Sequence, residues 1–175
     1  MVSMRFRVFL FALASALLAA CGESAAPGKV TADGYRDLDW SALIPPQDVD
    51  VLKRLQQAPI DHSGSMKAQQ VGTFNTVAAL DGAKVRIPGY IVPLEADDQG
   101  RLTEFFLVPF MGACIHVPPP PPNQIVYVKL PHGVEAPEIT DPYGVKGVLR
   151  THKTSNDLAG SAYVLEDASI APWQG

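Results

Sequence analysis

The sequence predicts a mainly β protein built around a small closed barrel. Short segments rich in β-branched and aromatic residues recur from residue 74 to the end of the chain. An Asp81-Gly82 pair lies between two of these segments and is a strong hairpin signal. The segment 84–94 begins with strict alternation and is then interrupted by Pro88-Gly89. This interruption predicts a bulge or a sharp bend within one strand.

Residues 35–72, before the predicted barrel, are expected to be helical or irregular and to pack on it. Apolar side chains are frequent from residue 35 to Pro46, where a pair of prolines stops regular structure. Asp48 is a suitable N-cap for a helix that runs to about Gln57. We expect this helix to cap one end of the barrel or to cover one edge.

The predicted barrel domain covers residues 73–175. Acidic residues 96–101 predict a turn, and the Pro-rich residues 112–123 predict an irregular connection. The expected strands are 74–80, 84–94, 102–108, 124–130, 145–150 and 161–165, the last extended by 168–171.

The order of these elements favours an OB-like closed barrel. A long bent strand that contains glycine is followed by a hairpin, a crossing segment and two further strands, which is typical of that fold. A partly open β-sandwich is the alternative. The expected architecture is therefore mainly β, with one short N-terminal helix.

The first 20 residues have the pattern of a lipoprotein signal peptide. Arg5 and Arg7 precede an apolar run, residues 8–18, which is too short to cross a bilayer comfortably. The small residues before Cys21 resemble the lipobox of bacterial lipoproteins. We therefore expect Cys21 to become the acylated N-terminus, and an ordinary secretory signal followed by a chance cysteine is the alternative. Residues 21–34 are small and polar and predict a flexible tether.

Charge and cysteine usage restrict the partners that we expect. The formal net charge is −4 and becomes −6 once Arg5 and Arg7 are removed with the signal. Because phosphate binding needs clustered Lys and Arg, we expect no nucleic-acid partner. Gly22 follows Cys21, and by resemblance to lipoprotein sorting in Gram-negative bacteria this favours the outer membrane. The expected location is the periplasm, with the membrane contacted through lipid.

The densest group of reactive side chains is Cys114 and His116. Two residues apart in an extended segment, they would point to the same side. A thiolate and an imidazole together suit zinc or copper, and they also suit a cysteine nucleophile. A buried, inert cysteine is the structural alternative. No sequence spacing ties the pair to the other candidate ligands, which are His62, His132, His152, Glu104, Asp97 and Asp98.

Five consecutive prolines follow directly and are the candidate docking segment. A polyproline segment is rigid, and exposed prolines offer a partner an apolar, pre-ordered surface with free carbonyls. A stiff connection with no partner is the alternative. The candidate docking residues are Pro118, Pro119, Pro120, Pro121, Pro122, Asn123 and Gln124.

Three segments together resemble a family of Gram-negative periplasmic lipoproteins of unknown function. They are Gly89–Glu95, Glu104–Pro109 and Gly112–Gln124, and the upstream Asp39–Pro46 also fits the pattern. The resemblance extends over residues 35–173. It implies a place near ABC-type export or lipoprotein-handling transporters and near metal-related periplasmic proteins.

Sequence alone thus predicts a lipid-anchored periplasmic binding or accessory protein that serves an envelope transporter or complex and is not an enzyme. Carriage or sensing of zinc or copper through Cys114 and His116 is the first alternative. A thiol-dependent enzyme that uses Cys114 is the second. In the main hypothesis there are no catalytic residues, and Cys21 is the site of lipidation.

Overall fold

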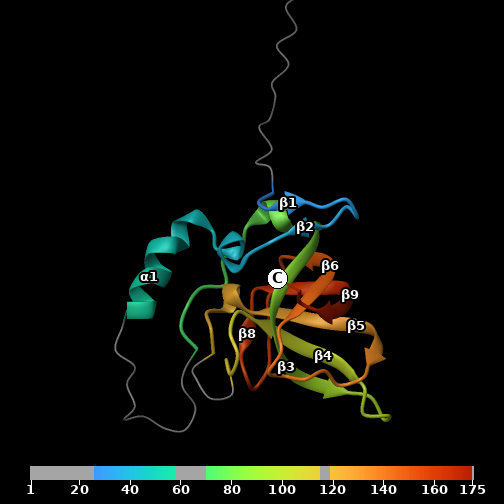
Figure 1. The fold of residues 1–175 in the computed structure, drawn as a ribbon. Coiled ribbons are helices and arrows are strands. Elements are labelled where there is room, and N and C mark those ends of the chain that lie inside the picture. Colours follow the sequence, from blue (N-terminus) through green and yellow to red (C-terminus); the bar gives the residue numbers. More distant parts are fainter. Residues whose placement is uncertain (1–25, 58–69, 115–118, 175) are drawn as a thin grey trace, which may run out of the picture.

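The computed structural model describes residues 26–57, 70–114 and 119–174. In the described residues, two short strands, one α-helix and three 3-10 helices precede a barrel of longer strands, and a fourth 3-10 helix and two more short strands lie between the barrel strands (Figure 1). The strands are β1 (Lys29–Val30), β2 (Arg36–Asp37), β3 (Lys84–Ala96), β4 (Leu102–Val108), β5 (Val126–Val134), β6 (Tyr143–Arg150), β7 (Thr154–Ser155), β8 (Gly160–Ser161) and β9 (Tyr163–Pro172). The helices are α1 (Val49–Gln57), η1 (Trp40–Leu43), η2 (Pro46–Asp48), η3 (Ala78–Leu80) and η4 (Pro122–Gln124).

Five strands close into a mixed barrel. They are hydrogen-bonded in the order β3-β4-β5-β9-β6, and β6 pairs again with β3. The pairing of β5 with β9 is parallel, and the other four pairings are antiparallel. This order, with the third and fifth barrel strands side by side, is that of an OB-like barrel. The predicted fold class is confirmed, and the alternative of an open sandwich is wrong.

The bent strand is β3, which changes partner along its length. Residues from Lys84 to Gly89 pair with β6, and residues from Tyr90 onward pair with β4. Gly89 lies at the change because a Cβ atom there would come within 2.7 Å of the Val108 carbonyl oxygen. The prediction of a bend at Pro88-Gly89 is confirmed in position, whereas the irregular register lies later, between Pro93 and Ala96.

Alternation along β4 divides the apolar side chains between two clusters. Phe105 and Leu107 belong to the main core, and Phe106 and Val108 belong to a second cluster on the other face of the strand. Successive side chains of a strand point to opposite faces, so both faces of β4 are covered. The main core includes Val85, Ile87, Ile91, Val126, Val128, Val145, Leu149, Tyr163 and Leu165.

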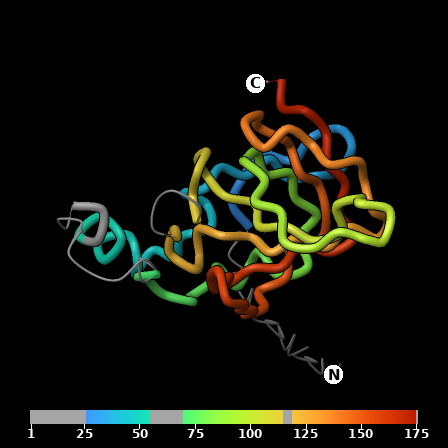
Figure 2. The backbone as a smooth tube through the Cα atoms, turned by 90° about the horizontal axis from the view of Figure 1, so that it is seen from below, coloured from blue at the N-terminus to red at the C-terminus, as the bar shows by residue number. Residues whose placement is uncertain are grey.

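The segment before the helix packs on the barrel as expected. Leu38 and Leu43 are buried in the main core. The Trp40 indole N–H donates to the Pro88 carbonyl at 2.8 Å. Asp39 caps η1 by accepting a hydrogen bond from the Ala42 amide at 3.1 Å. Helix α1, in contrast, extends to one side of the barrel in both views and does not lie across one of its ends (Figure 1 and Figure 2). Within the described residues, no helix is long and apolar enough to cross a membrane.

Part of the expected tether is structured. Residues Lys29 to Asp37 form a small antiparallel hairpin, and β2 continues as a parallel neighbour of β3. Thr31 Oγ1 donates to the Tyr35 carbonyl at 2.7 Å and closes the turn of the hairpin. Residues 29–34 of the predicted tether thus belong to the hairpin, because local turn bonds and the pairing of β2 with β3 order the chain there.

Three further expectations are wrong. Residues 74–80 form no strand, because the barrel is already closed and the Val77 amide donates to the Tyr163 hydroxyl at 2.7 Å. The turn at Asp81-Gly82 exists, but it leads from η3 into β3 and joins no hairpin. Asp48 precedes α1 as expected, but its carboxylate accepts from Thr73, Asn75 and Asn123 and does not cap the helix.

The remaining expected strands are confirmed with shifted bounds. The segment 102–108 matches β4, and 145–150 lies within β6. The strand expected at 124–130 begins later, at Val126, because Gln124 belongs to η4. The strand expected at 161–165 is divided at Ala162 between β8 and β9, and β9 runs to Pro172, past the expected extension.

Candidate functional site

Cys114 lies in a tight turn after β4. Its φ of 68° is in the left-handed region, which costs a non-glycine residue about 1–2 kcal/mol. The side chain is 9% exposed and packs in the second apolar cluster. The other members of this cluster are Val92, Phe106, Val108, Ala113, Ile125 and Ala159. The turn thus folds the chain back over the outer face of β4, with Cys114 as part of the cover.

The surroundings of the thiol determine its protonation. Burial raises the pKa of Cys114 to about 11. The thiolate is the form that attacks an electrophile or binds a metal, so the thiol is not activated in this environment. His116 lies outside the described residues, as does Pro118. The pairing of Cys114 with His116 therefore stays a prediction from sequence, and so does lipidation of Cys21, which also lies outside them.

The other candidate ligands that the structure describes do not converge, and His62 lies outside the described residues. Across residues 26–57, 70–114 and 119–174, no three His, Cys, Asp or Glu side chains come together in a way that could hold a metal ion. His132 and His152 are exposed. Glu104 contacts the Tyr127 hydroxyl and the Lys129 ammonium, and Asp97 is ion-paired with Arg101 in the turn after β3.

The described part of the polyproline segment is bound to the barrel domain through its carbonyl groups. The Pro120 carbonyl accepts from the Gln70 amide at 2.8 Å, and the Pro122 carbonyl accepts from the Ala162 N–H at 2.8 Å. Pro120 and Pro122 are buried, and Pro119 and Pro121 are half-buried. Pro120 and Pro122 are therefore not accessible to a partner, and docking through the other prolines stays a prediction from the sequence.

Asn123 and Gln124 face inward as well. Asn123 is fully buried, and its side-chain amide donates to Asp48 Oδ2 at 3.4 Å. The Gln124 amide donates to the Trp40 carbonyl at 3.0 Å. These two residues connect the segment after the prolines to η1 and to the start of α1. These hydrogen bonds give Asn123 and Gln124 a structural role that requires no ligand.

A pocket lies elsewhere in the described part of the protein, on the outer face of β3, β6 and β9. It has a volume of about 490 Å³. This volume is within the range of about 300–1,000 Å³ that is typical of small-molecule sites. Its wall contains two cationic side chains and one indole ring. The lining residues are Arg86, Gly144, Lys146, Ser169, Ile170, Ala171, Pro172, Trp173 and Gln174.

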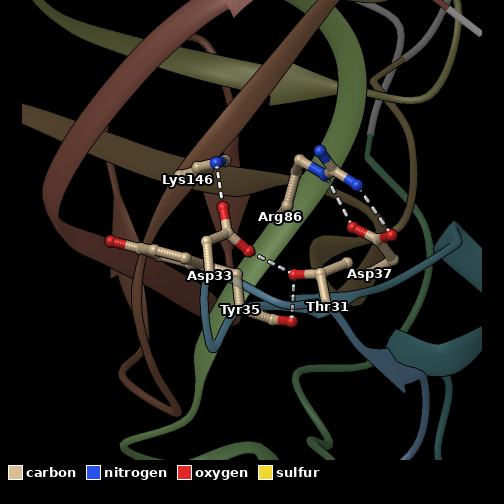
Figure 3. A network of polar contacts seen from close by, with 6 residues as sticks. All are labelled: Thr31, Asp33, Tyr35, Asp37, Arg86 and Lys146. Carbon is tan, nitrogen blue, oxygen red and sulfur yellow. Dashed lines mark hydrogen bonds and ion pairs between the residues drawn. The ribbon is translucent and has the colours of Figure 1, made fainter.

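Arg86 and Lys146 are direct neighbours across the β3–β6 pairing. Like charges opposite one another on adjacent strands repel, so this pair needs compensation. The hairpin of β1 and β2 supplies it (Figure 3). Asp37 binds the guanidinium of Arg86 through two bonds of 2.6 and 2.7 Å, and Asp33 binds the ammonium of Lys146.

Each of the two ion pairs shifts the pKa of one of its groups in the expected direction. Hydrogen bonds from Lys146 and Thr31 hold the pKa of Asp33 well below its usual range. Asp37 raises the pKa of Arg86 above its ordinary value. Asp33 is therefore anionic and Arg86 cationic at neutral pH. The Lys146 ammonium also lies 5.1 Å from the centroid of the Tyr35 ring, a favourable cation–π contact.

Trp173 forms the aromatic wall of the pocket. Its ring lies over Gly144, where a Cβ atom would come within 3.0 Å of Cε3. The Arg86 guanidinium is 5.7 Å from the centroid of the indole. The Trp173 amide donates to the Pro142 carbonyl at 3.0 Å, which fixes the backbone just after β9. Glycine at position 144 is therefore what allows the indole to lie against the sheet.

Comparison with known proteins assigns the chain to a family. A family model described as "Protein of unknown function (DUF3299)" matches residues 40–172. The chain belongs to the DUF3299 family. The crystal structure of a DUF3299 family protein from Pseudomonas aeruginosa PAO1 is similar, with 40% sequence identity and a TM-score of 0.66. That match covers 81% of this chain and 97% of the other. No curated protein matches the sequence.

The DUF3299 match confirms the resemblance to a family of unknown function, whereas the lipoprotein character stays a prediction from the sequence. The matched residues include Arg86 and Lys146, together with the Cys114 turn and the polyproline segment. Asp33 and Asp37 lie before the matched range. The ion pairs thus join the family domain to the hairpin that precedes it.

Sequence reasoning missed the pocket because its residues are far apart in the chain. Arg86 and Lys146 each follow an apolar residue in an alternating strand, so each could be predicted to point outward. Nothing in the sequence indicates that they are opposite one another, since this depends on the pairing of β3 with β6. Trp173 is a single aromatic residue after the last strand, and this alone does not indicate a pocket.

Proposed function

We propose that this protein is a lipid-anchored binding protein of the bacterial envelope that serves a transporter or another envelope complex and catalyses no reaction itself. Cys21 would carry the lipid, and residues 22–28 would connect it to the hairpin and the barrel. The periplasmic face of the outer membrane is the proposed location. The lipobox-like residues before Cys21, with Gly22 after it, support this part of the proposal.

The pocket bounded by Arg86, Lys146 and Trp173 is the observation that carries the binding role. It combines an apolar wall with a few polar groups, as ligand sites do. OB-like barrels commonly bind ligands on their outer surface, and this argument is an analogy of fold alone. The environment of Cys114 favours a structural role for its thiol, because burial raises its pKa to about 11. We therefore do not propose a thiol enzyme.

Anchoring is tested by metabolic labelling with an alkynyl fatty acid in a Gram-negative host. The full chain is compared with Cys21→Ser, and outer and inner membranes are separated on a density gradient. We expect label and an outer-membrane fraction for the natural sequence, and neither for the variant. Equal labelling of both proteins, or a natural chain found without lipid in the periplasm, would contradict the proposed anchor.

The accessory role is tested by crosslinking in intact cells. A photoreactive residue is placed at Gln174, on the rim of the pocket, and in parallel at Gln99, in the exposed turn after β3. A subunit of an ABC-type transporter crosslinked from position 174 and not from position 99 is the expected result. The same products from both positions would indicate nonspecific proximity and contradict the role.

A further inference from the structure

The side chains of Arg86 and Lys146 contribute to the pocket wall, but the aspartates that pair with them do not. Arg86 and Lys146 line the pocket, and neither Asp33 nor Asp37 does. The aspartates belong to the hairpin and approach the cations from its side (Figure 3). The pocket wall therefore has two positive side chains and no acidic one, although the four groups together are neutral.

Both cations keep donors for a ligand. Asp37 uses Nε and Nη2 of Arg86, and within the described residues Nη1 makes no hydrogen bond. Lys146 uses one N–H on Asp33 and has two further ones. Guanidinium and ammonium donors form strong charge-assisted bonds with a carboxylate. The side chains are 31% and 33% exposed respectively, so a ligand can reach them.

The rest of the wall is suited to an apolar group. Ile170, Pro172 and Trp173 lie beside the cations, and Ala171 lies between two of them in the chain. An aromatic ring can pack against the indole, which is itself fixed over Gly144. A ligand of this pocket would therefore have a negative end and an apolar body.

We propose that the pocket binds amphiphilic monocarboxylates, with the carboxylate between Arg86 Nη1 and Lys146 Nζ and an apolar or aromatic body against Trp173. One negative charge is favoured over two, because Asp33 and Asp37 already neutralise much of the positive potential. The carboxylate can be the C-terminus of a peptide or belong to a free organic acid. The inference rests on the proposed binding function and names its ligand class.

Binding is measured by calorimetry on the full chain as cells produce it, in lipid nanodiscs if it is acylated and in buffer if it is not. The probes are N-acetylphenylalanine, 3-phenylpropionate and the neutral N-acetylphenylalaninamide. We expect the acids to bind with a Kd on the order of 0.1–1 mM and the amide to bind at least about tenfold more weakly. Equal binding of acids and amide, or no binding of either acid, would overturn the proposal.

The two acids distinguish the source of the carboxylate. Tighter binding of N-acetylphenylalanine supports a peptide C-terminus, and tighter binding of 3-phenylpropionate supports a free acid. Both results support the ligand class. Carboxylate binding by a chain that is not acylated would overturn the anchor and leave the ligand class standing, so the two failures are distinguishable.

Substitutions inside and outside the pocket test whether the acids bind there. Lys146→Met and Trp173→Leu are each expected to weaken binding of the acids about tenfold, from the loss of one charge-assisted bond or of the aromatic wall. Arg150→Met is the matched control, since Arg150 is also on β6 and ion-paired, with Glu166 at 2.8 Å, but does not line the pocket. Its affinity should equal that of the natural chain. Unchanged affinity in Lys146→Met, with a native circular dichroism spectrum, would overturn the proposal.

The affinity of Asp33→Asn for the acids distinguishes a binding role of Lys146 from a purely structural one. Removal of this carboxylate leaves the ammonium without its internal anion, so the acids should bind several-fold more tightly and the amide should not change. Weaker binding of the acids to a variant with a native spectrum would contradict the assignment of their carboxylate to Lys146.

Discussion

The side-chain amide of Asn123 donates a hydrogen bond of 3.4 Å to the carboxylate of Asp48, which lies 75 residues earlier in the chain. Both residues are buried, at 0% and 3% exposure. Thr73 and Asn75 bind the same carboxylate, the latter at 2.9 Å. One buried carboxyl group therefore holds together the start of α1, the chain before η3 and the end of the polyproline segment. Neutral donors surround it, and this makes each donor important to stability.

We predict that Asn123→Ala destabilises the protein more than Asn75→Ala does. The first change removes a buried donor and leaves a cavity, at an expected cost of about 2–3 kcal/mol. Asn75 is exposed, so water can replace its amide and the cost should stay near 1 kcal/mol or below, as for ordinary surface bonds. Urea unfolding followed by circular dichroism measures both values. Equal losses, or a larger one for Asn75→Ala, would mean that the buried contact does not hold the segments together.

A second prediction concerns the thiol of Cys114. With its pKa raised to about 11, it should react with a neutral alkylating reagent at pH 7.5 far more slowly than a free cysteine, whose pKa is about 8.5. The rate should keep rising up to pH 10 and should become normal in urea. The measurement uses Cys21→Ser, in which Cys114 is the only thiol. Rapid native reaction at pH 7.5 would support the thiol-enzyme alternative.

The same shift makes stability depend on alkaline pH. The folded protein keeps the Cys114 proton to about pH 11, whereas the unfolded chain releases it near pH 8.5. The unfolded state then binds fewer protons, so the contribution of Cys114 to stability is complete below pH 8.5 and decreases as pH rises toward 11. Cys114→Ala, compared across this range by urea unfolding, should show a weaker decrease than Cys21→Ser alone. Parallel pH profiles would refute this contribution.

The sequence predicted those barrel strands that are recognisable from the residue pattern of a single segment. The alternation in 84–94 and the apolar segment 102–108 identified β3 and β4, and Pro88-Gly89 marked the bend. A strand was predicted at 74–80 from its apolar residues, but none forms. A segment becomes a strand only where a sheet edge is free to pair with it, and the closed barrel leaves no free edge there. The hairpin 29–37 was missed because its order comes from long-range contacts with β3 and β6. The pocket was not predicted for the same reason, since Arg86, Lys146 and Trp173 meet only through strand pairing.

Tyr163 is the third position at which we predict an effect. Its hydroxyl donates to the Leu43 carbonyl at 2.9 Å and accepts from the Val77 amide at 2.7 Å, inside the protein. Tyr163→Phe leaves both backbone groups without this partner and should cost about 1–3 kcal/mol. Tyr143→Phe is the matched control, because Tyr143 is also buried and its hydroxyl makes no hydrogen bond within the described residues. Unfolding in urea should separate the two variants, and equal stabilities would show that water replaces the lost bonds.

The fifth prediction tests the bend in β3. Gly89→Ala places a Cβ atom within 2.7 Å of the Val108 carbonyl oxygen and 3.0 Å of the Leu107 side chain. The closer atom belongs to the backbone of β4, so a rotamer change cannot relieve the clash, and we expect a loss of about 1–3 kcal/mol. Because β3 joins β4 just after Gly89, hydrogen exchange should accelerate most at the amides of β4, and less in the pairing of β6 with β9. A uniform acceleration would show that the bend and the rest of the barrel open as one unit, and an unchanged protein would show that β3 can move away from β4 without loss of pairing.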